Sequence, residues 1–581
     1  MIYSRRISAK KLSKTVMLRS VSSFLMAATF TLSTATAHAA PGVLSEVPLF
    51  LSQSVQPNIL FILDDSWSMA FEVLMTTGAK QYYDRGIEED SDYYDQGYLT
   101  FKPGDDVRNN LEHCAGYNAM AYNPNITYTP WYGKDADGNA FTDQSITKAR
   151  VNPYTGGRTA EGCEGQGEDI RGKEHHILNR NGVYCDLTKI ENDGKVVDAS
   201  GNAKSGAFYY PWHDDGDGVF QEGECSSSTD TNIKFQYSDR VYVADLDTEA
   251  KKTNYANWFS YYRKRDYVMK RAVSQIIDES RDRLGMATLN RNPHIMDSER
   301  KVGTLVKDVD DLTYPIDAAA AANKAKLMDN LLGISTDKST PLRSTLNRAG
   351  QYFKGELPKH RLFGYRPWDD EDSANGHSPI LKAALGGTCQ QNFVLLVTDG
   401  FWNKTVSDIG NIDDAESEGD EDVSDVDVSE FDGQSYADEY EDTLADIAMK
   451  YYKTDLLSDL ANEVPTVSIY PGADSVQTCY GGDDASVKLQ NCFDTNNAQH
   501  LVTFVVSFGV VGTIPATYPD GRECYPHNRH QSLEDQNWPK DCGADFVGWP
   551  KVVSATETTT DDMMHAAWNG RGRYLSANEP E

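Results

Sequence analysis

The sequence PNILFILDDSWSMA, residues 57–70, decides the fold that we expect for this chain. Its apolar part, Ile59–Leu63, is rich in branched residues and too short for a helix, so it predicts a buried strand. The polar part lies at the carboxyl end of that strand, where open α/β sheets bind ligands. In a near-extended loop, the oxygens of Asp64, Ser66 and Ser68 point to one side. These hard ligands suit Mg²⁺, Mn²⁺ or Ca²⁺ rather than zinc or copper; an N-cap loop is the alternative, because Asp and Ser often cap helices.

Residues 1–39 have the features of a secretory signal peptide. A basic start that includes Arg5 and Arg6 precedes the apolar stretch Val21–Thr36 and the A-x-A cleavage site at Ala37–Ala39. The residues after the arginine pair fit twin-arginine export poorly, so ordinary Sec export is expected. Because no later run is long and apolar enough to span a bilayer, the mature chain is predicted to be exported, to the periplasm or cell surface, without a transmembrane segment.

Charge and cysteine content narrow the function classes. The formal net charge of −33 falls to about −39 once the signal peptide, with six bases and no acid, is removed. This charge argues against nucleic acid or an anionic membrane as a partner. The nine cysteines predict disulfides after export, and none has the CxxC spacing of zinc or redox sites. Cys479/Cys492 and Cys524/Cys542 are plausible local pairs; since the number is odd, at least one thiol is free or pairs with another chain.

The mature chain is predicted to consist of an α/β domain and a large insertion. The α/β domain comprises residues 56–70 and 251–578, and residues 71–250 form a loop-rich insertion that contains four of the cysteines. Within the α/β domain, a second insertion at about 411–442 has fifteen acids and no base between Asp413 and Asp442, which indicates a solvated loop.

Strand and helix patterns alternate through the α/β domain. Further strands are predicted at 284–289, 392–397 and 501–511, and helices at 254–280, 317–334, from Pro341 onward and at 443–457, with a last helix and short strand at 563–577. This alternation predicts a mostly parallel sheet with helices on both faces. Asp64 and Asp399 each follow a buried strand, so both are expected at the carboxyl edge of the sheet.

The loop after the first strand, taken with two later residues, resembles the metal-ion-dependent adhesion site (MIDAS) of von Willebrand factor A domains. The family pattern of D-x-S-x-S, a threonine and a strand-end aspartate is matched by Asp64, Ser66 and Ser68, by Thr340 in STPLRSTLNRAG and by Asp399 in LLVTDG. The resemblance implies a von Willebrand A-like (Rossmann-like) fold. It also implies an Mg²⁺ (or Mn²⁺ or Ca²⁺) ion bound directly by both serines, and directly or through water by the other three residues. In the family, a partner's acidic side chain completes the coordination.

The MIDAS resemblance has one departure. Trp67 stands where the family usually has a glycine between the two serines. The ligands are unaffected by this change, but it alters the loop's backbone or the rim of the site.

A second resemblance covers most of the mature chain. Six stretches between about 110 and 577 are similar, in the same order, to the N-terminal half of the PilY/PilC tip-associated adhesins of type IV pili: CAGYNAMAYNPNITYTPW, NYANWFSYYRKRDYVMKRA, TCQQNFVLLVTDGFWN, DTLADIAMKYYKTDL, HLVTFVVSFGVVGT and HAAWNGRGRYLSA. In that family a C-terminal β-propeller with a regulatory calcium site follows the von Willebrand A domain. This sequence ends where the propeller would begin, so the propeller and its calcium site are not expected in it.

The resemblance implies a metal-dependent adhesion and assembly factor of type IV pili, at the pilus tip or outer surface. Its partners would be pilins or minor pilins and a host or abiotic surface ligand. A non-adhesive periplasmic scaffold for envelope assembly is the alternative. Enzymatic activity is not expected, because G-x-S-x-G, P-loop and G-x-G-x-x-G motifs are absent; a metallohydrolase would also need a general base, and none is identifiable.

A second cation site is predicted in the large insertion. Asp215, Asp217, Gly218 and Glu224 occupy positions 3, 5, 6 and 12 of an EF-hand-like loop, with His213 in place of the usual first aspartate. These acids would bind Ca²⁺. Because no helix pair flanks the loop, an acidic turn without metal is the alternative.

Overall fold

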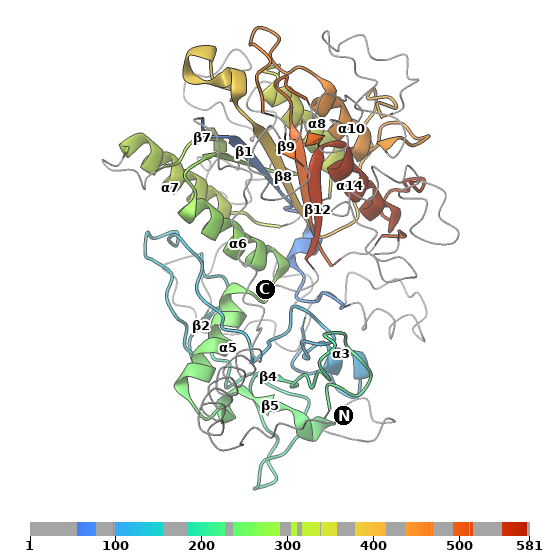
Figure 1. Cartoon of the computed structure of the whole chain (residues 1–581). Coiled ribbons are helices and arrows are strands. Elements are labelled where there is room, and N and C mark those ends of the chain that lie inside the picture. Colours follow the sequence, from blue (N-terminus) through green and yellow to red (C-terminus); the bar gives the residue numbers. More distant parts are fainter. Residues whose placement is uncertain are drawn as a thin grey trace, which may run out of the picture. The chain divides into compact units, whose positions relative to one another are not determined.

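A six-stranded sheet forms the centre of the α/β part of the chain in this computed structural model (Figure 1). The strand order is β12-β11-β8-β1-β6-β7. The structure describes residues 55–76, 97, 99–154, 184–226, 236–290, 304–310, 317–336, 339–356, 378–413, 436–465, 467–468, 492–494, 496–509, 512–514 and 549–577. The predicted signal peptide at 1–39 lies outside these residues.

The first strand, β1 (Asn58–Leu63), is central and parallel to both neighbours, β6 (Arg283–Thr288) and β8 (Asn392–Thr398). Beyond β8 lie β11 (Val502–Phe508) and β12 (Arg571–Ala577), also parallel. Numbered along the chain, the six strands follow the order 3-2-1-4-5-6. The first three strands extend the sheet to one side and the last three extend it to the other, so the strand order reverses between β1 and β8. The predicted strands and the mostly parallel sheet are confirmed.

The sixth strand of the sheet, β7 (Thr304–Asp308), was not predicted, and it is antiparallel to β6. Its sequence TLVKD has only a short apolar run, and it occupies the edge of the sheet. Antiparallel edge strands are common on otherwise parallel sheets.

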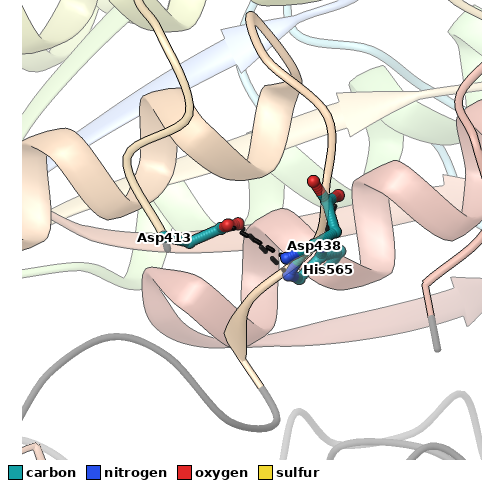
Figure 2. Close-up of side chains that lie close together, drawn as sticks. All are labelled: Asp413, Asp438 and His565. Carbon is teal, nitrogen blue, oxygen red and sulfur yellow. Dashed lines mark hydrogen bonds and ion pairs between the residues drawn. The ribbon is translucent and has the colours of Figure 1, made fainter. Parts of the chain in front are cut away.

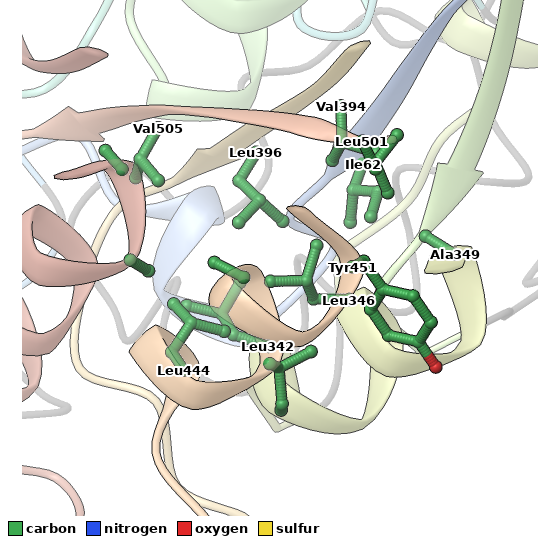
Figure 3. Close-up of a cluster of buried hydrophobic side chains, with 14 of the residues drawn as sticks. Ile62, Leu342, Leu346, Ala349, Val394, Leu396, Leu444, Tyr451, Leu501 and Val505 are labelled. Carbon is green, nitrogen blue, oxygen red and sulfur yellow. The ribbon is translucent and has the colours of Figure 1, made fainter. Parts of the chain in front are cut away.

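Helices cover both faces of the sheet. One face carries α6 (Arg265–Glu279) and α7 (Ala318–Leu332); the other carries α8 (Leu342–Phe353), α10 (Leu444–Lys453) and α14 (Thr558–Asn569). Successive side chains of β1 alternate between the two cores. Leu60 and Ile62 pack in the core with α8, α10 and α14, of which Figure 3 shows Ile62 beside α8 and α10. Phe61 and Leu63 pack with α6 and α7.

The single helix predicted over 254–280 is wrong. The segment forms two helices, α5 (Glu249–Tyr261) and α6, separated by Tyr262, Arg263 and Lys264. At the break, the buried Arg263 donates from Nε to Glu72 Oε1 at 2.7 Å and from Nη1 to the carbonyl oxygen of Phe259 at 2.6 Å. The apolar spacing continues through the break, so the sequence could not reveal this tertiary ion pair.

The large insertion has its own aromatic core and only short regular elements. These are α3 (Val107–Leu111), the antiparallel pair β2 (Ala149–Arg150) with β3 (Tyr184–Cys185), the pair β4 (Phe208–Tyr209) with β5 (Val241–Tyr242), and the 3₁₀ turns η5 (Tyr237–Asp239) and η6 (Val243–Asp245). Outside the insertion lie η2 (Trp67–Ala70), η8 (Ala383–Leu385), η9 (Gly387–Cys389), and β9 (Val467–Ser468) paired with β10 (Cys492–Asp494).

A disulfide closes most of the insertion into one loop. Cys114 and Cys225 are bonded across a sequence separation of 111. Cys389, on η9, is a free thiol. The predicted pairs Cys479/Cys492 and Cys524/Cys542 each include a residue outside the described part of the chain, so they stay predictions.

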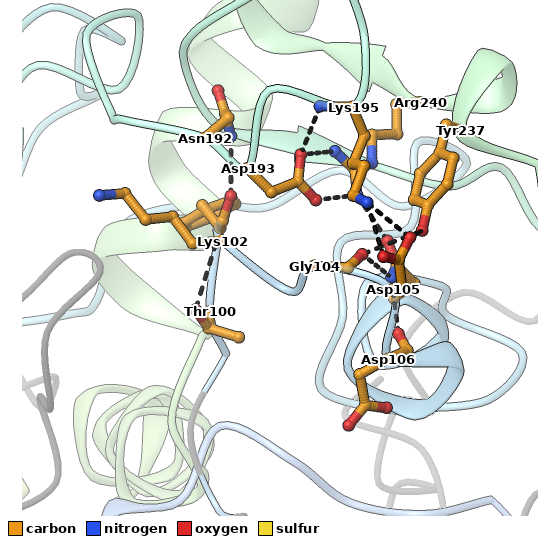
Figure 4. A network of polar contacts seen from close by, with 12 residues as sticks. Thr100, Lys102, Gly104, Asp105, Asp106, Asn192, Asp193, Lys195, Tyr237 and Arg240 are labelled. Carbon is orange, nitrogen blue, oxygen red and sulfur yellow. Dashed lines mark hydrogen bonds and ion pairs between the residues drawn. The ribbon is translucent and has the colours of Figure 1, made fainter.

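A buried arginine ties together the loops of the insertion (Figure 4). Arg240 donates to both carboxylate oxygens of Asp193 at 2.8 Å, to the Tyr210 hydroxyl at 2.9 Å and to Asn110 Oδ1 at 2.6 Å. Its bidentate geometry is the strong form of a charge-assisted hydrogen bond. Nearby, Lys195 Nζ lies 2.6 Å from Asp105 Oδ1, so a second ion pair joins the same loops.

Acid is expected to weaken this insertion through His113. Its ring lies 4.9 Å and 4.6 Å, centroid to centroid, from Phe101 and Phe208, and Nε2 is 2.8 Å from the Thr100 carbonyl oxygen. Burial lowers the pKa of His113 to about 4. The unfolded chain therefore binds the proton first, and stability is lost as pH falls from about 6.5 to 4.

The size of the effect follows from the two pKa values. Between pH 7 and 5, His113 should remove about 2 kcal/mol of unfolding free energy, measured by urea titration. His113→Gln, which cannot titrate, serves as the control. The difference in pH dependence between the two proteins separates the contribution of His113 to the unfolding free energy from that of the carboxylates. An equal pH dependence in both would contradict the prediction.

Candidate metal centre

The loop after β1 is held to the end of β8 by the Asp64 carboxylate. Oδ1 accepts a hydrogen bond from the Ser66 backbone N at 2.7 Å, and Oδ2 accepts one from the Thr398 hydroxyl at 2.6 Å. The backbone N of Asp64 also donates to the Val397 carbonyl oxygen at 2.9 Å. The loop is therefore fixed at the point where the strand order reverses, which is where open α/β sheets bind ligands.

Three of the predicted ligands form a chain of hydrogen bonds. The hydroxyl oxygens of Ser66 and Ser68 are 3.2 Å apart, and Ser68 Oγ donates to Asp399 Oδ1 at 2.8 Å. Ser66 is the N-cap residue of η2, yet its side chain makes no capping hydrogen bond. The hydroxyl thus faces its neighbour serine rather than the helix, which disfavours the N-cap alternative.

Thr340 reaches the same region through its backbone. It precedes α8. Its backbone N donates to Asn403 Oδ1 at 3.1 Å, and its carbonyl oxygen accepts from the backbone N of Asn403 at 3.2 Å. Asn403 lies four residues after Asp399, so the threonine is tied to the loop that follows β8. Within the described part of the chain, no hydrogen bond joins the Thr340 hydroxyl to the other four predicted ligands.

Asp65, which was not among the predicted site residues, supports the loop from the other side. Its Oδ1 accepts hydrogen bonds from the backbone N and the Nδ2 of Asn290, each at 2.9 Å, and Asn290 Nδ2 also donates to the Ser339 carbonyl oxygen at 2.6 Å. Burial raises the pKa of Asp65 to about 6. Asp65 therefore connects the β1 loop to the residues just before Thr340.

Arg265 contacts one of the predicted ligands, which the sequence did not reveal. It begins α6, is buried, and donates from Nη1 to Asp399 Oδ2 at 2.8 Å. Its Nη2 donates to the Val73 carbonyl oxygen at 2.6 Å, which fixes the guanidinium. In the sequence it is one of several bases in YRKRD, so only its burial beside Asp399 sets it apart.

The charges at the site fit a bound cation. Asp64 and Asp399 are both buried, with Arg265 as the cation paired with one of them. Burial, and after it the charge of Asp399, raises the pKa of Asp64 to about 8. Carboxylate and hydroxyl oxygens gathered beside excess negative charge are the donor set of a hard divalent ion. The residues present therefore fit the Mg²⁺ implied by the sequence.

Trp67 is partly buried rather than fully exposed on the rim. It packs against the buried pair Ala70 and Phe71. The side chain therefore has a packing role in the loop, beside whatever it contributes to a binding surface.

The EF-hand-like segment brings Asp214, Asp215 and Asp217 together as three exposed carboxylates. Asp214 Oδ1 accepts from the N atoms of Gly216 and Gly218 at 3.0 and 3.1 Å, as the first aspartate of such loops does. Asp214 was not among the predicted ligands.

Glu224, the remaining predicted ligand of this loop, is not part of the group of three carboxylates. Its Oε2 accepts from Trp212 Nε1 at 2.9 Å and from Gln221 N at 2.8 Å. A calcium site built on Asp215, Asp217 and Glu224 stays a prediction.

Comparison with known proteins finds three similar pilus biogenesis factors. It is 26% identical over 559 residues to the type IV pilus biogenesis factor PilY1 of Pseudomonas aeruginosa PAO1, which covers 95% of this chain and 39% of that protein. PilY1 of strains PAK and UCBPP-PA14 is 24% identical over 95% and 92% of the chain. The chain is therefore similar to PilY1 along nearly its whole length.

The chain spans about two fifths of the length of those curated relatives. No protein-family model and no solved structure matches it. Among the described residues, none of the helices has the length and apolar character needed to cross a membrane.

Proposed function

We propose that this chain is an exported, metal-dependent adhesion and assembly factor of type IV pili, which binds its partner through a MIDAS-type site in a von Willebrand A-like domain. The observation that carries the proposal is the 2.8 Å hydrogen bond from Ser68 Oγ to Asp399 Oδ1. It joins two residues 331 positions apart in the sequence, each at the carboxyl end of a central strand. The 3-2-1-4-5-6 strand order, with one antiparallel edge strand, supports the fold assignment.

Ser66, Ser68, Thr340, Asp64 and Asp399 would hold the ion, with Mg²⁺ as the first choice and Mn²⁺ or Ca²⁺ as substitutes. The ion supplies a positive centre with an open position, which attracts a carboxylate of the partner. The chain's own residues orient this position: Thr398 and the Ser66 backbone fix Asp64, and Arg265 fixes Asp399. A pilin, a minor pilin or a surface ligand would provide the acidic group. Calcium in the Asp215/Asp217 loop is a separate proposal.

We expect no enzymatic activity, because the carboxylates of Asp64 and Asp399 are engaged by hydrogen bonds and the Arg265 ion pair. Neither is then available as a general base. Assay of the purified protein for hydrolysis with Mg²⁺ or Mn²⁺ tests this expectation. The second candidate function is a non-adhesive periplasmic scaffold in the same envelope system, which would use the fold but not the ion.

Cells that express Asp64→Ala distinguish the two. Adhesion should be lost while the variant is exported at normal levels. Asp245→Asn, which removes an exposed acid from the insertion, is the matched control and should behave as wild type. Normal adhesion by Asp64→Ala, at normal surface levels, would overturn the metal-dependent mechanism and favour the scaffold if deletion of the protein still abolished pili.

Arg265 gives a further prediction about the ion. Arg265→Met removes the cation paired with Asp399 and leaves a buried carboxylate unpaired, which should cost about 3–5 kcal/mol of unfolding free energy. Added Mg²⁺ should therefore raise the melting temperature of Arg265→Met more than that of wild type, since the ion would replace the missing charge. Equal Mg²⁺-induced shifts in the two proteins would mean that Arg265 and the ion do not share Asp399.

A further inference from the structure

A second buried cluster lies apart from the residues of the proposed MIDAS-type site. Asp413, Asp438 and His565 each offer a ligand atom within 4.8 Å of the others (Figure 2). Their side chains are 0–2% exposed. Asp413 and Asp438 come from the two ends of the acidic insertion, and His565 comes from α14. The cluster therefore joins segments that are far apart in the chain.

The hydrogen bonds of His565 determine which ring nitrogen is free. Nε2 is 2.5 Å from the Tyr436 carbonyl oxygen, which can only accept, so Nε2 carries the hydrogen. In a neutral ring, Nδ1 then has a lone pair. Metal-bound histidines usually donate their other ring N–H to such a carbonyl, which fixes the tautomer and the ring orientation. His565 is therefore oriented as a ligand that binds through Nδ1.

Asp438 faces that nitrogen with an unsatisfied oxygen. Its Oδ2 is buried, receives no hydrogen bond, and lies 3.5 Å from His565 Nδ1. Two acceptors that face each other out of contact with water are unfavourable unless a proton or a metal ion lies between them. A separation of 3.5 Å is long for a hydrogen bond, but it matches the roughly 3.3–3.6 Å between two ligands of a tetrahedral ion with bonds of about 2.0–2.2 Å.

Asp413, whose Oδ2 lies 3.5 Å from His565 Nε2, would supply the third group, and its neighbours add negative charge. Its Oδ1 accepts from the Asp438 backbone N at 3.1 Å, and its Oδ2 accepts from Asn569 Nδ2 at 2.8 Å, so the carboxylate is held in place. In the described part of the chain, neither Asp413 nor Asp438 forms an ion pair with a lysine or arginine. Asp446 and Asp562 are also buried and repel members of the cluster. A dication would offset this charge.

We propose that Asp413, Asp438 and His565 form a divalent-metal site for a first-row transition ion, with Zn²⁺ as the best fit. One imidazole and two carboxylates are the mixed donor set of such ions, whereas Mg²⁺ prefers oxygen alone. The ion would fasten both ends of the acidic insertion to α14. This proposal does not depend on the MIDAS-type site.

Metal content tests the proposal. Purified, chelator-stripped protein is incubated with Zn²⁺ in excess Mg²⁺, which saturates hard-oxygen sites, and bound zinc is measured by mass spectrometry. One Zn²⁺ per wild-type chain is expected, with at least a tenfold weaker affinity in His565→Gln and in Asp438→Asn. Asp438→Asn keeps the shape of the side chain, so it guards against loss of folding. Asp408→Asn, an exposed acid outside the cluster, is the control and should keep the zinc.

Cobalt gives an independent readout. Co²⁺ at this site should produce visible absorption of low-coordinate cobalt that His565→Gln lacks. Absence of stoichiometric zinc in wild type, or equal zinc in His565→Gln, would overturn the proposal and leave a cluster that is balanced by bound protons.

Discussion

If Asp399 is a ligand as proposed, Asp399→Asn is expected to weaken Mg²⁺ binding by at least about 100-fold. The substitution removes the charge of that ligand, while the new side chain stays buried beside the two serines. Loss of a residue that merely supports a metal ligand typically costs 10–100-fold, so loss of a ligand itself should cost more. Titration calorimetry of the chelator-stripped protein measures the effect.

The control for this substitution is chosen to match its charge and its pairing. Asp135, in the insertion, pairs with Arg150 at 3.0 Å as Asp399 pairs with Arg265 at 2.8 Å. Asp135→Asn should bind Mg²⁺ like wild type. If both variants bind Mg²⁺ equally well, Asp399 is not a ligand.

Asp399→Asn also leaves Arg265 as an unpaired buried charge, which weakens folding. The double variant Arg265→Met/Asp399→Asn removes both charges. It should regain stability without regaining Mg²⁺ affinity, which separates a folding defect from loss of a ligand.

The second large effect concerns the disulfide of the insertion. Replacing Cys114 and Cys225 by serine should lower the unfolding free energy by about 4–5 kcal/mol, because the bond closes a loop with a sequence separation of 111. In the chain-entropy model a 100-residue loop is worth about 4.7 kcal/mol. Urea unfolding under non-reducing conditions, followed by tryptophan fluorescence, measures the change.

Cys389→Ser provides the matched control. It removes a thiol that is free in the structure, so its effect should stay within about 0.5 kcal/mol. A double variant as stable as Cys389→Ser would show that the aromatic core and Arg240, rather than the disulfide, hold the insertion together.

Several features of the fold follow from local sequence. Alternating side chains of β1 are buried on two faces, as the continuous apolar run predicts for a buried strand. The aspartates that follow β1 and β8 are placed by strand direction alone, since parallel strands share one carboxyl edge. By contrast, β7 at the sheet edge has too short an apolar run to be predicted.

Charged groups that meet across long sequence distances could not be predicted. The break between α5 and α6, the contact of Arg265 with Asp399 and the His565 cluster each depend on buried polar pairs, and periodicity carries no information on such pairs. His565 in HAAWN has no spacing that marks a ligand. His565 has Asp413 and Asp438 as neighbours only because α14 packs against the two ends of the acidic insertion.

The sequence by itself determined the mostly parallel sheet, the burial of β1, and the grouping of Asp64, Ser66, Ser68 and Asp399 near one edge. It could do so because burial of apolar strands and strand direction are local properties. The tertiary structure alone decided which cations and anions face one another. Arg265 therefore appears beside Asp399, and Asp438 beside His565, since the energy of a buried charge depends on partners that only folding brings near.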